Sequence, residues 1–279
     1  MLKAKKQLSI HLLAPLKPGL FDRYLVSQLA LHWQKAGHRI TTGPTELVDT
    51  DVCICHWDRT VVPKTFLPKN PHGKICLNFD ILDISKRNYS ILELKKGDEW
   101  NGGVIIKSNF NYFGELEWGM KKKTRLDKIR RSLSVKYWKH VRMLPPKNYP
   151  VLDNIREVPN WVWNDPNLLV EKFMPEREGE FYCLRSWLFF GGRGYIFKLF
   201  SRDKVIKVKN STHHEFLDSE PPPELIAFRK KHRIDFGKLD YVVIDGKAIV
   251  VDLNKTPMMG SDPYTSRMAN LSEGLYDFI

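Results

Sequence analysis

Three oxygen-bearing side chains near the end of the chain have the types and the spacing of a divalent-cation site. They are Asp240, Asp252 and Asn254. Asp252 and Asn254 are two residues apart, so both side chains would point to the same face of a β-strand. Carboxylate and amide oxygens are ligands that Mg2+ accepts, usually together with oxygens of a substrate phosphate. The three residues therefore predict a Mg2+ site, and the alternative is an ordinary hairpin with polar strand ends.

A β-hairpin is the element that would bring these residues together. Residues 241–244 and 248–251 are apolar and predict two strands, and Asp245-Gly246 between them strongly favours a tight turn. Asp240 enters the first strand, and the other two ligands leave the second. The predicted turn therefore places all three side chains at the same end of the hairpin.

Composition limits the class of protein. A chain of 279 residues with 42% hydrophobic residues suits two globular domains or one elaborate domain. No apolar run approaches the roughly 18 residues that span a bilayer. The run 8–14 is too short for a signal peptide and lacks a cleavage site. The four cysteines show no disulfide-framework spacing, so we expect reduced thiols and a cytoplasmic protein. They are Cys53, Cys55, Cys76 and Cys183.

The net charge of +13 is concentrated in one segment. Residues 121–147 carry eleven Lys and Arg against one acid, Asp127, so ten of the thirteen net positive charges lie there. Thr124 and Asp127 fit a helix capping box, and Pro145-Pro146 ends the pattern. Between them, six apolar residues recur at helical spacing. They are Leu126, Ile129, Leu133, Tyr137, Val141 and Leu144.

This pattern predicts an amphipathic helix over 124–144. We expect its apolar stripe to pack inward and its lysines and arginines to face outward. The basic face is then either a solvated helix surface or a docking surface for an acidic substrate, a carrier or a membrane headgroup. A nucleic-acid-binding module is the less favoured interpretation, because the charge is confined to one element and no known RNA or DNA motif accompanies it.

Residues 1–85 predict an N-terminal α/β domain, in which short apolar strands alternate with a helix. This order is typical of βαβ units with a parallel sheet. The region contains neither G-x-G-x-x-G nor a P-loop motif, so it gives no support for dinucleotide or P-loop phosphate binding. Strands are expected at 8–13, 38–42, 51–55 and 74–78, and a helix at 21–35.

Residues 86–170 predict a second unit that contains the basic helical insert. We expect Ser85 to cap a helix that runs to Leu94. Residues 103–107 form an apolar strand that ends in Lys107 and opens into a polar and aromatic turn. A lysine at such a strand end can reach a phosphate, although many strand-end lysines are simply solvated.

Residues 171–279 predict a third unit that contains the metal-binding hairpin. Successive antiparallel strands are expected at 181–190, 195–200 and 205–208. The hairpin follows them, and a helix that starts at about residue 266 carries apolar residues on one face.

Three segments, taken in chain order, resemble the ATP-grasp superfamily. They are 103–107, 170–173 (Val-Glu-Lys-Phe) and 251–254 (Val-Asp-Leu-Asn). The resemblance covers about residues 80–279, and the preceding α/β region looks like the domain that normally precedes an ATP-grasp fold. It implies mixed α/β and α+β architecture. An N-terminal βαβ domain would be followed by an ATP-grasp fold of two α+β subdomains, of the carboxylate–amine ligase type.

The resemblance also implies roles for residues along the chain. Lys107 resembles the strand lysine that contacts the α- and β-phosphates of ATP, and Lys86 resembles the earlier lysine on the same side. The segment 108–114 lies where the family has a flap over the phosphates. Glu171 and Phe173 belong to the hinge that would meet the adenine edge.

Further along, Glu180 lies where a ribose-binding acid is expected, with Glu176 and Glu178 close enough to compete. Arg185 resembles the arginine that holds the acyl phosphate or the substrate carboxylate. Lys207 would be a further cation on the phosphate side. The implied Mg2+ ligands are Asp240, Asp252 and Asn254.

The function that the resemblance implies is ligation of a carboxylate to an amine, dependent on ATP and Mg2+. It proceeds through an acyl phosphate and releases ADP and phosphate, and its catalysis rests on positioning and charge neutralisation. An ATP-grasp kinase that phosphorylates a small molecule is the alternative. The expected substrates are a small molecule, a peptide, or an acidic glycan or carrier. Nucleic acid is not expected as a partner, and homo-oligomerisation stays open.

Overall fold

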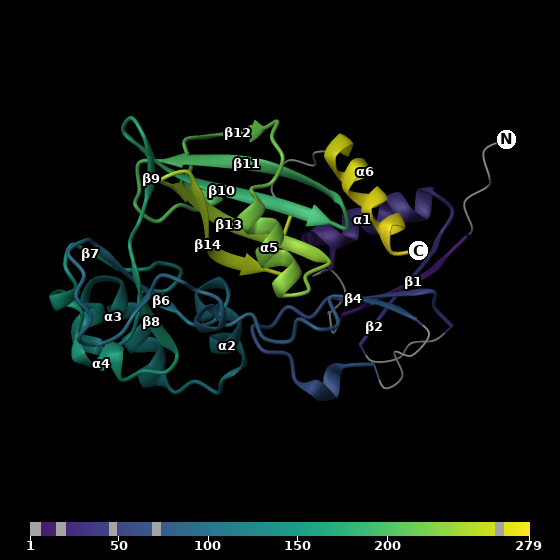
Figure 1. Ribbon diagram of the computed structural model, residues 1–279. Coiled ribbons are helices and arrows are strands. Elements are labelled where there is room, and N and C mark those ends of the chain that lie inside the picture. The colour runs from purple at the N-terminus through teal and green to yellow at the C-terminus, as the bar shows by residue number, and fades with distance from the viewer. Residues whose placement is uncertain (1–6, 15–20, 45–48, 69–73, 260–264) are drawn as a thin grey trace.

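Three β-sheets organise the protein, which we describe from a computed structural model. The structure describes residues 7–14, 21–44, 49–68, 74–259 and 265–279. Figure 1 shows the N-terminal sheet and the middle sheet at opposite ends, with the large C-terminal sheet above them. None of the helices within those residue ranges is long and apolar enough to cross a membrane.

The first sheet contains four parallel strands in the order β2-β1-β3-β4. Helix α1 (Leu25–Lys35) follows β1 and packs Leu29 and Trp33 into the core. This arrangement confirms the predicted βαβ fold with a parallel sheet. Its elements are β1 (Ser9–Leu13), β2 (Arg39–Gly43), β3 (Val52–Cys55), β4 (Ile75–Leu77) and the 3-10 helices η1 (Phe21–Arg23) and η2 (Lys64–Phe66).

The second sheet has the order β5-β8-β6-β7, and its strand pairs are antiparallel. Strand β8 ends at Lys172 and so crosses the predicted boundary between residues 170 and 171. The domain limits 1–85, 86–170 and 171–279 stay predictions. The strands of this region are β5 (Glu93–Leu94), β6 (Val104–Ser108), β7 (Val151–Leu152) and β8 (Leu168–Lys172). Its helices are α2 (Glu115–Met120), α3 (Arg125–Val141), α4 (Asn160–Trp163), η3 (Lys86–Asn88), η4 (Tyr112–Gly114) and η5 (Ile155–Glu157).

The third sheet has the order β12-β11-β10-β13-β14, with β9 also paired to β10. Helix α5 covers one face, where Trp187, Leu239 and Tyr241 belong to a buried cluster. The strands are β9 (Glu176–Glu178), β10 (Phe181–Phe190), β11 (Arg193–Ser201), β12 (His213–Leu217), β13 (Phe236–Ile244) and β14 (Lys247–Asn254). The helices are α5 (Pro223–Lys231), α6 (Thr265–Glu273), η6 (Val208–Asn210) and η7 (Gly274–Phe278).

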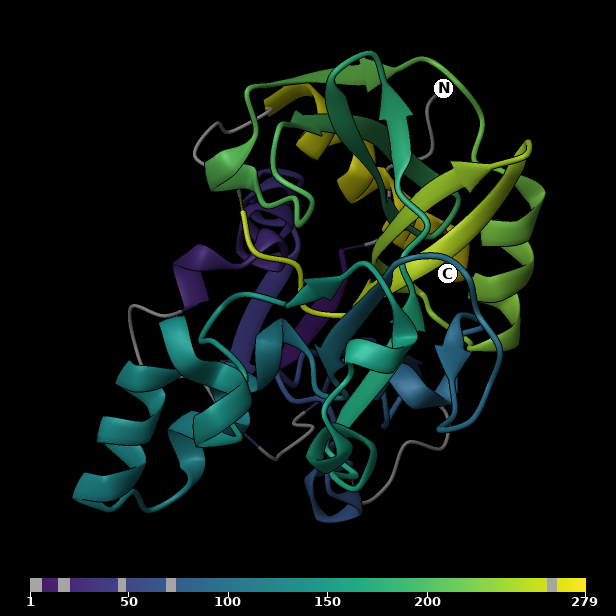
Figure 2. The same ribbon diagram turned by 90° about the vertical axis from the view of Figure 1, so that its left-hand side faces the viewer.

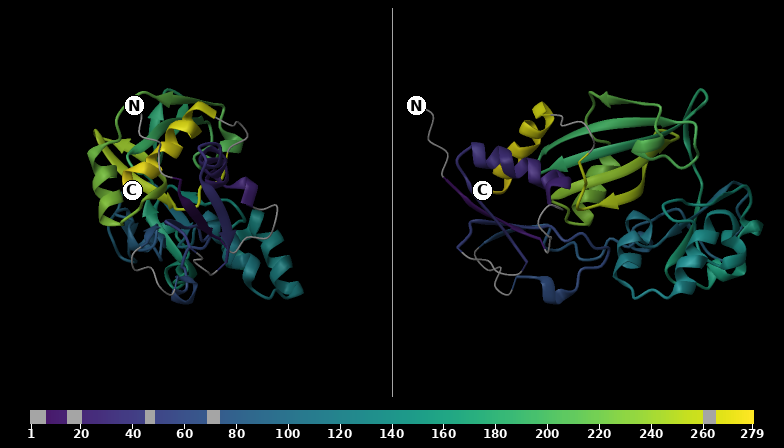
Figure 3. Two further views of the ribbon diagram at one scale, coloured as in Figure 1. Left: turned by 90° about the vertical axis from the view of Figure 1, so that its right-hand side faces the viewer. Right: turned by 180° about the vertical axis from the view of Figure 1, so that it is seen from behind.

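One hydrophobic core joins the first and third sheets. Trp33 of α1, Phe190 of β10 and Leu271 of α6 belong to a single buried cluster. The indole nitrogen of Trp33 donates to the carbonyl oxygen of Ser272, 2.9 Å away. Helices α1 and α6 therefore lie side by side, as Figure 3 shows from behind, and they fix the N-terminal sheet against the C-terminal one.

The helix predicted from Ser85 to Leu94 is wrong. Only the short turn η3 forms there, and β5 follows it. The backbone N–H of Lys86 donates to the carbonyl of Asn109 at 3.0 Å, and that of Arg87 donates to Asn109 Oδ1 at 3.0 Å. Contacts with a distant segment, rather than local helix propensity, therefore fix this stretch of backbone.

The strand predicted over 205–208 is also wrong. The side chain of Asn210 accepts from the backbone N–H of Lys207 at 2.7 Å and donates to the carbonyl of Val205 at 3.0 Å. Such bonds between a side chain and nearby backbone offer an alternative to strand pairing. The strand that pairs with β11 is β12, which begins at His213.

Helix α3 forms with the predicted capping box and with most of its basic residues exposed, but its apolar stripe is not buried as predicted. Thr124 Oγ1 accepts from the backbone N–H of Asp127 at 3.1 Å, and Asp127 Oδ2 accepts from that of Thr124 at 2.9 Å. The apolar stripe does not pack inward along most of its length. Its exposed members are Leu126, Ile129, Leu133 and Tyr137, whereas Val141 and Leu144 are half-buried.

Polar contacts on the inner side of α3 explain this orientation. Arg131 donates to both carboxylate oxygens of Glu115, at 2.5 and 2.7 Å, and its guanidinium carbon lies 4.6 Å from the centre of the Trp118 ring. Ser134 is fully buried and donates to the carbonyl of Leu144 at 3.2 Å. The ion pair and the stacked guanidinium of Arg131 thus turn a polar side of the helix inward, which hydrophobic spacing alone does not predict.

Candidate functional site

A cavity of about 300 Å3 lies between the second and third sheets. Strands β6 and β8 form one wall, and strands β10, β13 and β14 form the opposite wall. Loop residues 111–113, 173–175 and 204–207 also line it, together with Lys86, Leu92 and Tyr149. Eight of the ten site residues predicted from the sequence line this one cavity. They are Lys86, Lys107, Glu171, Phe173, Lys207, Asp240, Asp252 and Asn254.

The predicted hairpin is confirmed and contains a β-bulge. Asp240 and Asp252 lie directly opposite each other, whereas the next pair is Tyr241 with Val250, so Val251 is the extra residue. The bulge reverses the alternation along β14, because Val250 packs in the core under α5 while Asp252 lines the cavity. Both carboxylates therefore face the same space.

Each of these carboxylates has a lysine beside it. Lys86 Nζ lies 2.9 Å from Asp252 Oδ1, and Lys238 Nζ lies 2.8 Å from Asp240 Oδ2. Ser186 donates to the other oxygen of Asp240 at 2.5 Å. Burial would raise the pKa of Asp252, but the positive charges of Lys86 and its neighbours outweigh that effect and hold the pKa below its ordinary value. Asp252 is consequently ionised at neutral pH.

Lys107 connects the two walls of the cavity. Its Nζ atom lies 2.6 Å from Glu171 Oε2 on the neighbouring strand. It also donates to the carbonyl of Val251 at 3.1 Å, which is the residue that the bulge displaces. Lys107 and Glu171 are both buried. The strand-end lysine is thus held in place rather than solvated, with its charge directed into the cavity.

Lys238 is a cavity residue that sequence reasoning missed. It lies on β13 opposite Asn254, and both side chains line the cavity. The sequence feature that could have identified Lys238 is its position two residues before Asp240, because residues two apart lie on the same face of a strand. Lys238 supplies a third lysine beside the carboxylate pair, in addition to Lys86 and Lys107.

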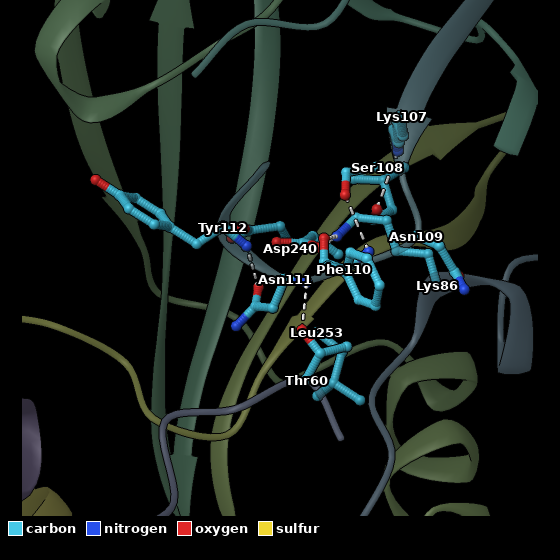
Figure 4. A network of polar contacts seen from close by, with 12 residues as sticks. Thr60, Lys86, Lys107, Ser108, Asn109, Phe110, Asn111, Tyr112, Asp240 and Leu253 are labelled. Carbon is cyan, nitrogen blue, oxygen red and sulfur yellow. Dashed lines mark hydrogen bonds and ion pairs between the residues drawn. The ribbon is translucent and has the colours of Figure 1, made fainter. Parts of the chain in front are cut away.

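The loop over the cavity has an unusual backbone. Tyr112 and Phe113 have φ angles of +44° and +59°, which non-glycine residues rarely adopt. The backbone N–H of Asn111 donates to Thr60 Oγ1 at 2.8 Å, so the segment that follows strand β3 holds this loop in place. Figure 4 shows this contact, with Lys86 and Lys107 on one side of the loop and the Tyr112 ring pointing the other way. Three residues of this loop, Asn111, Tyr112 and Phe113, line the cavity.

Lys207 reaches the cavity from the loop that joins β11 and β12. Its Nζ atom donates to the carbonyl of Lys147 and lies 5.3 Å from the centre of the Phe113 ring. Burial, together with the charge of Lys209, lowers its pKa from the ordinary value. The two loops therefore meet at Lys207 and Phe113, which both line the cavity.

Arg185 does not line the cavity, because it lies on the other face of the sheet. It pairs in register with Tyr241, whereas the cavity residue Asp240 pairs with Ser186. Its guanidinium makes bonds of 2.7 to 3.0 Å to the carboxylate of Glu176. Because adjacent residues of a strand face opposite sides, Arg185 is directed away from the cavity, and its contact with a phosphate or substrate carboxylate stays a prediction.

Glu180 is likewise outside the residues that line the cavity. It lies in the turn between β9 and β10, its side chain is 61% exposed, and it pairs with Arg202 at 3.0 Å. The two nearby candidates, Glu176 and Glu178, are paired with Arg185 and Lys198. The structure places none of the three carboxylates on the cavity wall.

The oxygen donors at this site fit Mg2+. Asp240, Asp252 and Asn254 supply two carboxylates and an amide, and the two adjacent lysines balance the carboxylate charges. Within the residues that the structure describes, no group of three or more His, Cys, Asp and Glu side chains is arranged to hold a metal. A cation held here would therefore be completed by oxygens from a substrate, as Mg2+ bound to phosphates usually is.

Comparisons with known proteins show the fold. No family profile and no curated protein matches this sequence. The macrocyclase MdnC bound with precursor peptide MdnA, from Microcystis aeruginosa MRC, is 9% identical with a TM-score of 0.52, over 95% of this chain and 98% of that one. D-alanine–D-alanine ligase from Bacillus anthracis, complexed with ATP, is 13% identical with a TM-score of 0.50, over 97% and 96%. A RimK domain ATP-grasp protein from Sphaerobacter thermophilus DSM 20745 is 11% identical with a TM-score of 0.49, over 97% and 99%.

The protein therefore has the ATP-grasp fold. Its parallel N-terminal sheet precedes two α+β regions, which confirms the predicted fold class for the residues that the structure describes. At these identities the comparisons concern the fold alone. What the cavity does must be argued from its own residues.

Proposed function

We propose that this protein is an ATP-dependent ligase that joins a carboxylate to an amine and uses Mg2+. One observation carries the proposal: the opposed carboxylates of Asp240 and Asp252 and the lysines Lys86, Lys107 and Lys238 line a single cavity. In a similar fold, D-alanine–D-alanine ligase is complexed with ATP, and MdnC is bound with a precursor peptide. These similarities support nucleotide binding and a small-molecule or peptide substrate.

ATP would lie along the cavity with its base at the apolar end. Phe173, Met174 and Pro175 follow strand β8 and give that end an apolar lining suited to adenine. The phosphates would lie toward Lys86 and Lys107, whose ammonium groups offset negative charge. In this orientation the γ-phosphate points toward the carboxylate pair on β13 and β14.

The proposed reaction has two steps. A carboxylate oxygen of the first substrate attacks the γ-phosphorus of ATP, the bond from that phosphorus to the bridging oxygen breaks, and ADP leaves with the electron pair. The amine nitrogen of the second substrate then attacks the acyl carbon, the carbon–oxygen bond to phosphate breaks, and the nitrogen loses a proton. The products are an amide, ADP and phosphate.

The chain's own residues supply positioning and charge. Lys107 and Lys238 hold positive charge at fixed positions near the transferred group, which is how protein sites stabilise phosphoryl transfer. Asp240, Asp252 and Asn254 would hold Mg2+, which neutralises phosphate charge when bound. The loops that carry Phe113 and Lys207 cover the site and would keep water from the acyl phosphate.

Measuring ADP and phosphate release with pairs of substrates tests this function. Amino acids, small peptides and sugar acids would be screened singly and in pairs. A ligase releases ADP and phosphate only when both a carboxylate and an amine are present, and it forms an amide. A stable phosphorylated product with a single substrate would instead show a kinase. Asp252→Asn should abolish the signal, whereas Asp245→Asn, at the exposed turn of the same hairpin, should not.

A further inference from the structure

Helix α3 presents an apolar stripe to solvent. Leu126 is 66% exposed, Ile129 55%, Leu133 45% and Tyr137 54%. Their spacings of three and four residues place them along one side of the helix. Isolated exposed apolar residues are ordinary on protein surfaces, but a contiguous row over three turns marks an interaction site.

Basic side chains border this stripe on the exposed side. The only acid between residues 121 and 147, Asp127, is used in the capping box at the start of the helix. The outward face of α3 therefore combines apolar and positively charged groups, with no carboxylate beyond that cap. The exposed basic residues along the helix are Arg125, Lys128, Lys136 and Lys139.

The position of α3 leaves this face accessible. Figure 2 shows the two helices α2 and α3, in teal at the lower left, projecting away from the three sheets. Figure 3 shows the same projection from the opposite side. No residue of α3 lines the cavity between the second and third sheets. The outward face of α3 thus lies on a helix that projects at the edge of the molecule, with the basic residues beside it.

We propose that this face of α3 binds the surface of an anionic lipid membrane. An interfacial helix buries a row of apolar residues at the headgroup boundary while its lysines and arginines contact anionic headgroups. A second copy of this chain would bring two clusters of positive charge together, which disfavours self-association through the same face. An acidic peptide would match the charge, but a projecting helix suits a broad, flat surface better than a narrow strand or helix. Membrane binding by α3 would determine where the protein is located, and it is independent of the reaction proposed above.

Sedimentation of the full-length protein with vesicles tests this inference. We expect binding to vesicles of equimolar phosphatidylcholine and phosphatidylglycerol, and none to phosphatidylcholine alone. The variant Leu126→Ser/Ile129→Ser/Leu133→Ser removes the apolar stripe and should lose vesicle binding. The variant Lys128→Gln/Lys136→Gln/Lys139→Gln should weaken it on the order of a hundredfold, since each cation near an anionic surface contributes about 1 kcal/mol.

A matched control lies on helix α5. Ile226 is 50% exposed there, and Lys230 and Lys231 are on the same helix. The variant Ile226→Ser/Lys230→Gln/Lys231→Gln changes similar groups and should bind vesicles like the wild type. Equal binding to both kinds of vesicle, or vesicle binding that survives loss of the apolar stripe, would overturn the proposal.

Two further outcomes would identify a different partner. Poly-glutamate binding that the α3 substitutions abolish, with no vesicle binding, would show an acidic peptide as the occupant. A dimer that the same substitutions dissociate, measured by light scattering, would show a second copy. Either result would replace the lipid surface. Unchanged circular dichroism spectra would establish that the variants fold, which the exposure of the substituted residues leads us to expect.

Discussion

Lys86 and Asp252 join the two walls of the cavity, with Lys86 Nζ 2.9 Å from Asp252 Oδ1. The lysine comes from the short turn before the second sheet, and the aspartate comes from the last strand of the third sheet. Their contact connects the turn that would bind the ATP phosphates to the strand that would bind the cation. For a phosphate that carries Mg2+, the lysine would face the phosphate and the carboxylate would face the cation, and having both in position lowers the cost of arranging them.

Lys107 should have separable roles in stability and in nucleotide binding. Lys107→Met leaves the buried carboxylate of Glu171 without its cation, which costs about 3–5 kcal/mol in such pairs. Lys107→Met/Glu171→Gln removes both charges and should recover most of that loss in chemical denaturation. Both variants should bind ATP more weakly in titration calorimetry. An ATP affinity equal to that of the wild type in the double variant would show that Lys107 is only structural.

Lys238 should contribute to turnover. Lys238→Met removes a fixed positive charge beside Asp240, and loss of one such group typically lowers kcat on the order of a hundredfold. Lys247→Met, on the exposed end of the same hairpin, is the control and should leave kcat unchanged. The measurement is steady-state ADP release once substrates are identified. Equal rates in the two variants would remove Lys238 from the site.

Arg185 should stabilise the fold without touching the reaction. Arg185→Met leaves the Glu176 carboxylate without its bidentate partner, so the free energy of unfolding should fall by a few kcal/mol. ATP affinity should not change, because Arg185 is on the face of the sheet away from the cavity. Calorimetry below the unfolding temperature would separate the two effects. A large loss of ATP affinity would restore the role that the sequence suggested.

His56 should make the protein less stable in acid. Burial, with the charge of Lys255 nearby, lowers its pKa to about 3, far below the ordinary value of 6.5. Between those values the unfolded chain binds a proton that the folded chain does not, so stability falls as the pH drops from 6.5 toward 3. The contribution is on the order of 5 kcal/mol. His56→Leu should flatten this part of the curve of unfolding free energy against pH, measured with urea. An unchanged slope would contradict the prediction.

Local patterns in the sequence predict much of the architecture. The strand predicted over 181–190 matches β10 residue for residue, and the Asp245-Gly246 turn closes the hairpin as expected. The capping box of α3 also forms, because it depends only on residues three positions apart. Features that depend on near neighbours along the chain can therefore be predicted from the sequence.

Features fixed by distant contacts cannot be predicted in this way. The bulge at Val251 depends on the pairing of β14 with β13, and it decides that Asp252 rather than Val250 faces the cavity. Arg185 lies on the far face of its sheet because of its register with β13, which the sequence does not reveal. Helix α3 turns its stripe outward because Arg131 pairs with Glu115 on another helix. In each case a partner on another element outweighs the local pattern.

The Mg2+ dependence of ATP affinity tests the central claim most directly. Titration calorimetry with ATP, with and without Mg2+, would compare the wild type with Asp252→Asn and Asp245→Asn. The first aspartate lines the cavity and the second lies at the exposed turn of the same hairpin. If Asp240 and Asp252 hold the cation between ATP and β14, Mg2+ should strengthen ATP binding in the wild type and in Asp245→Asn, and much less in Asp252→Asn. Equal Mg2+ dependence in all three proteins would contradict the account.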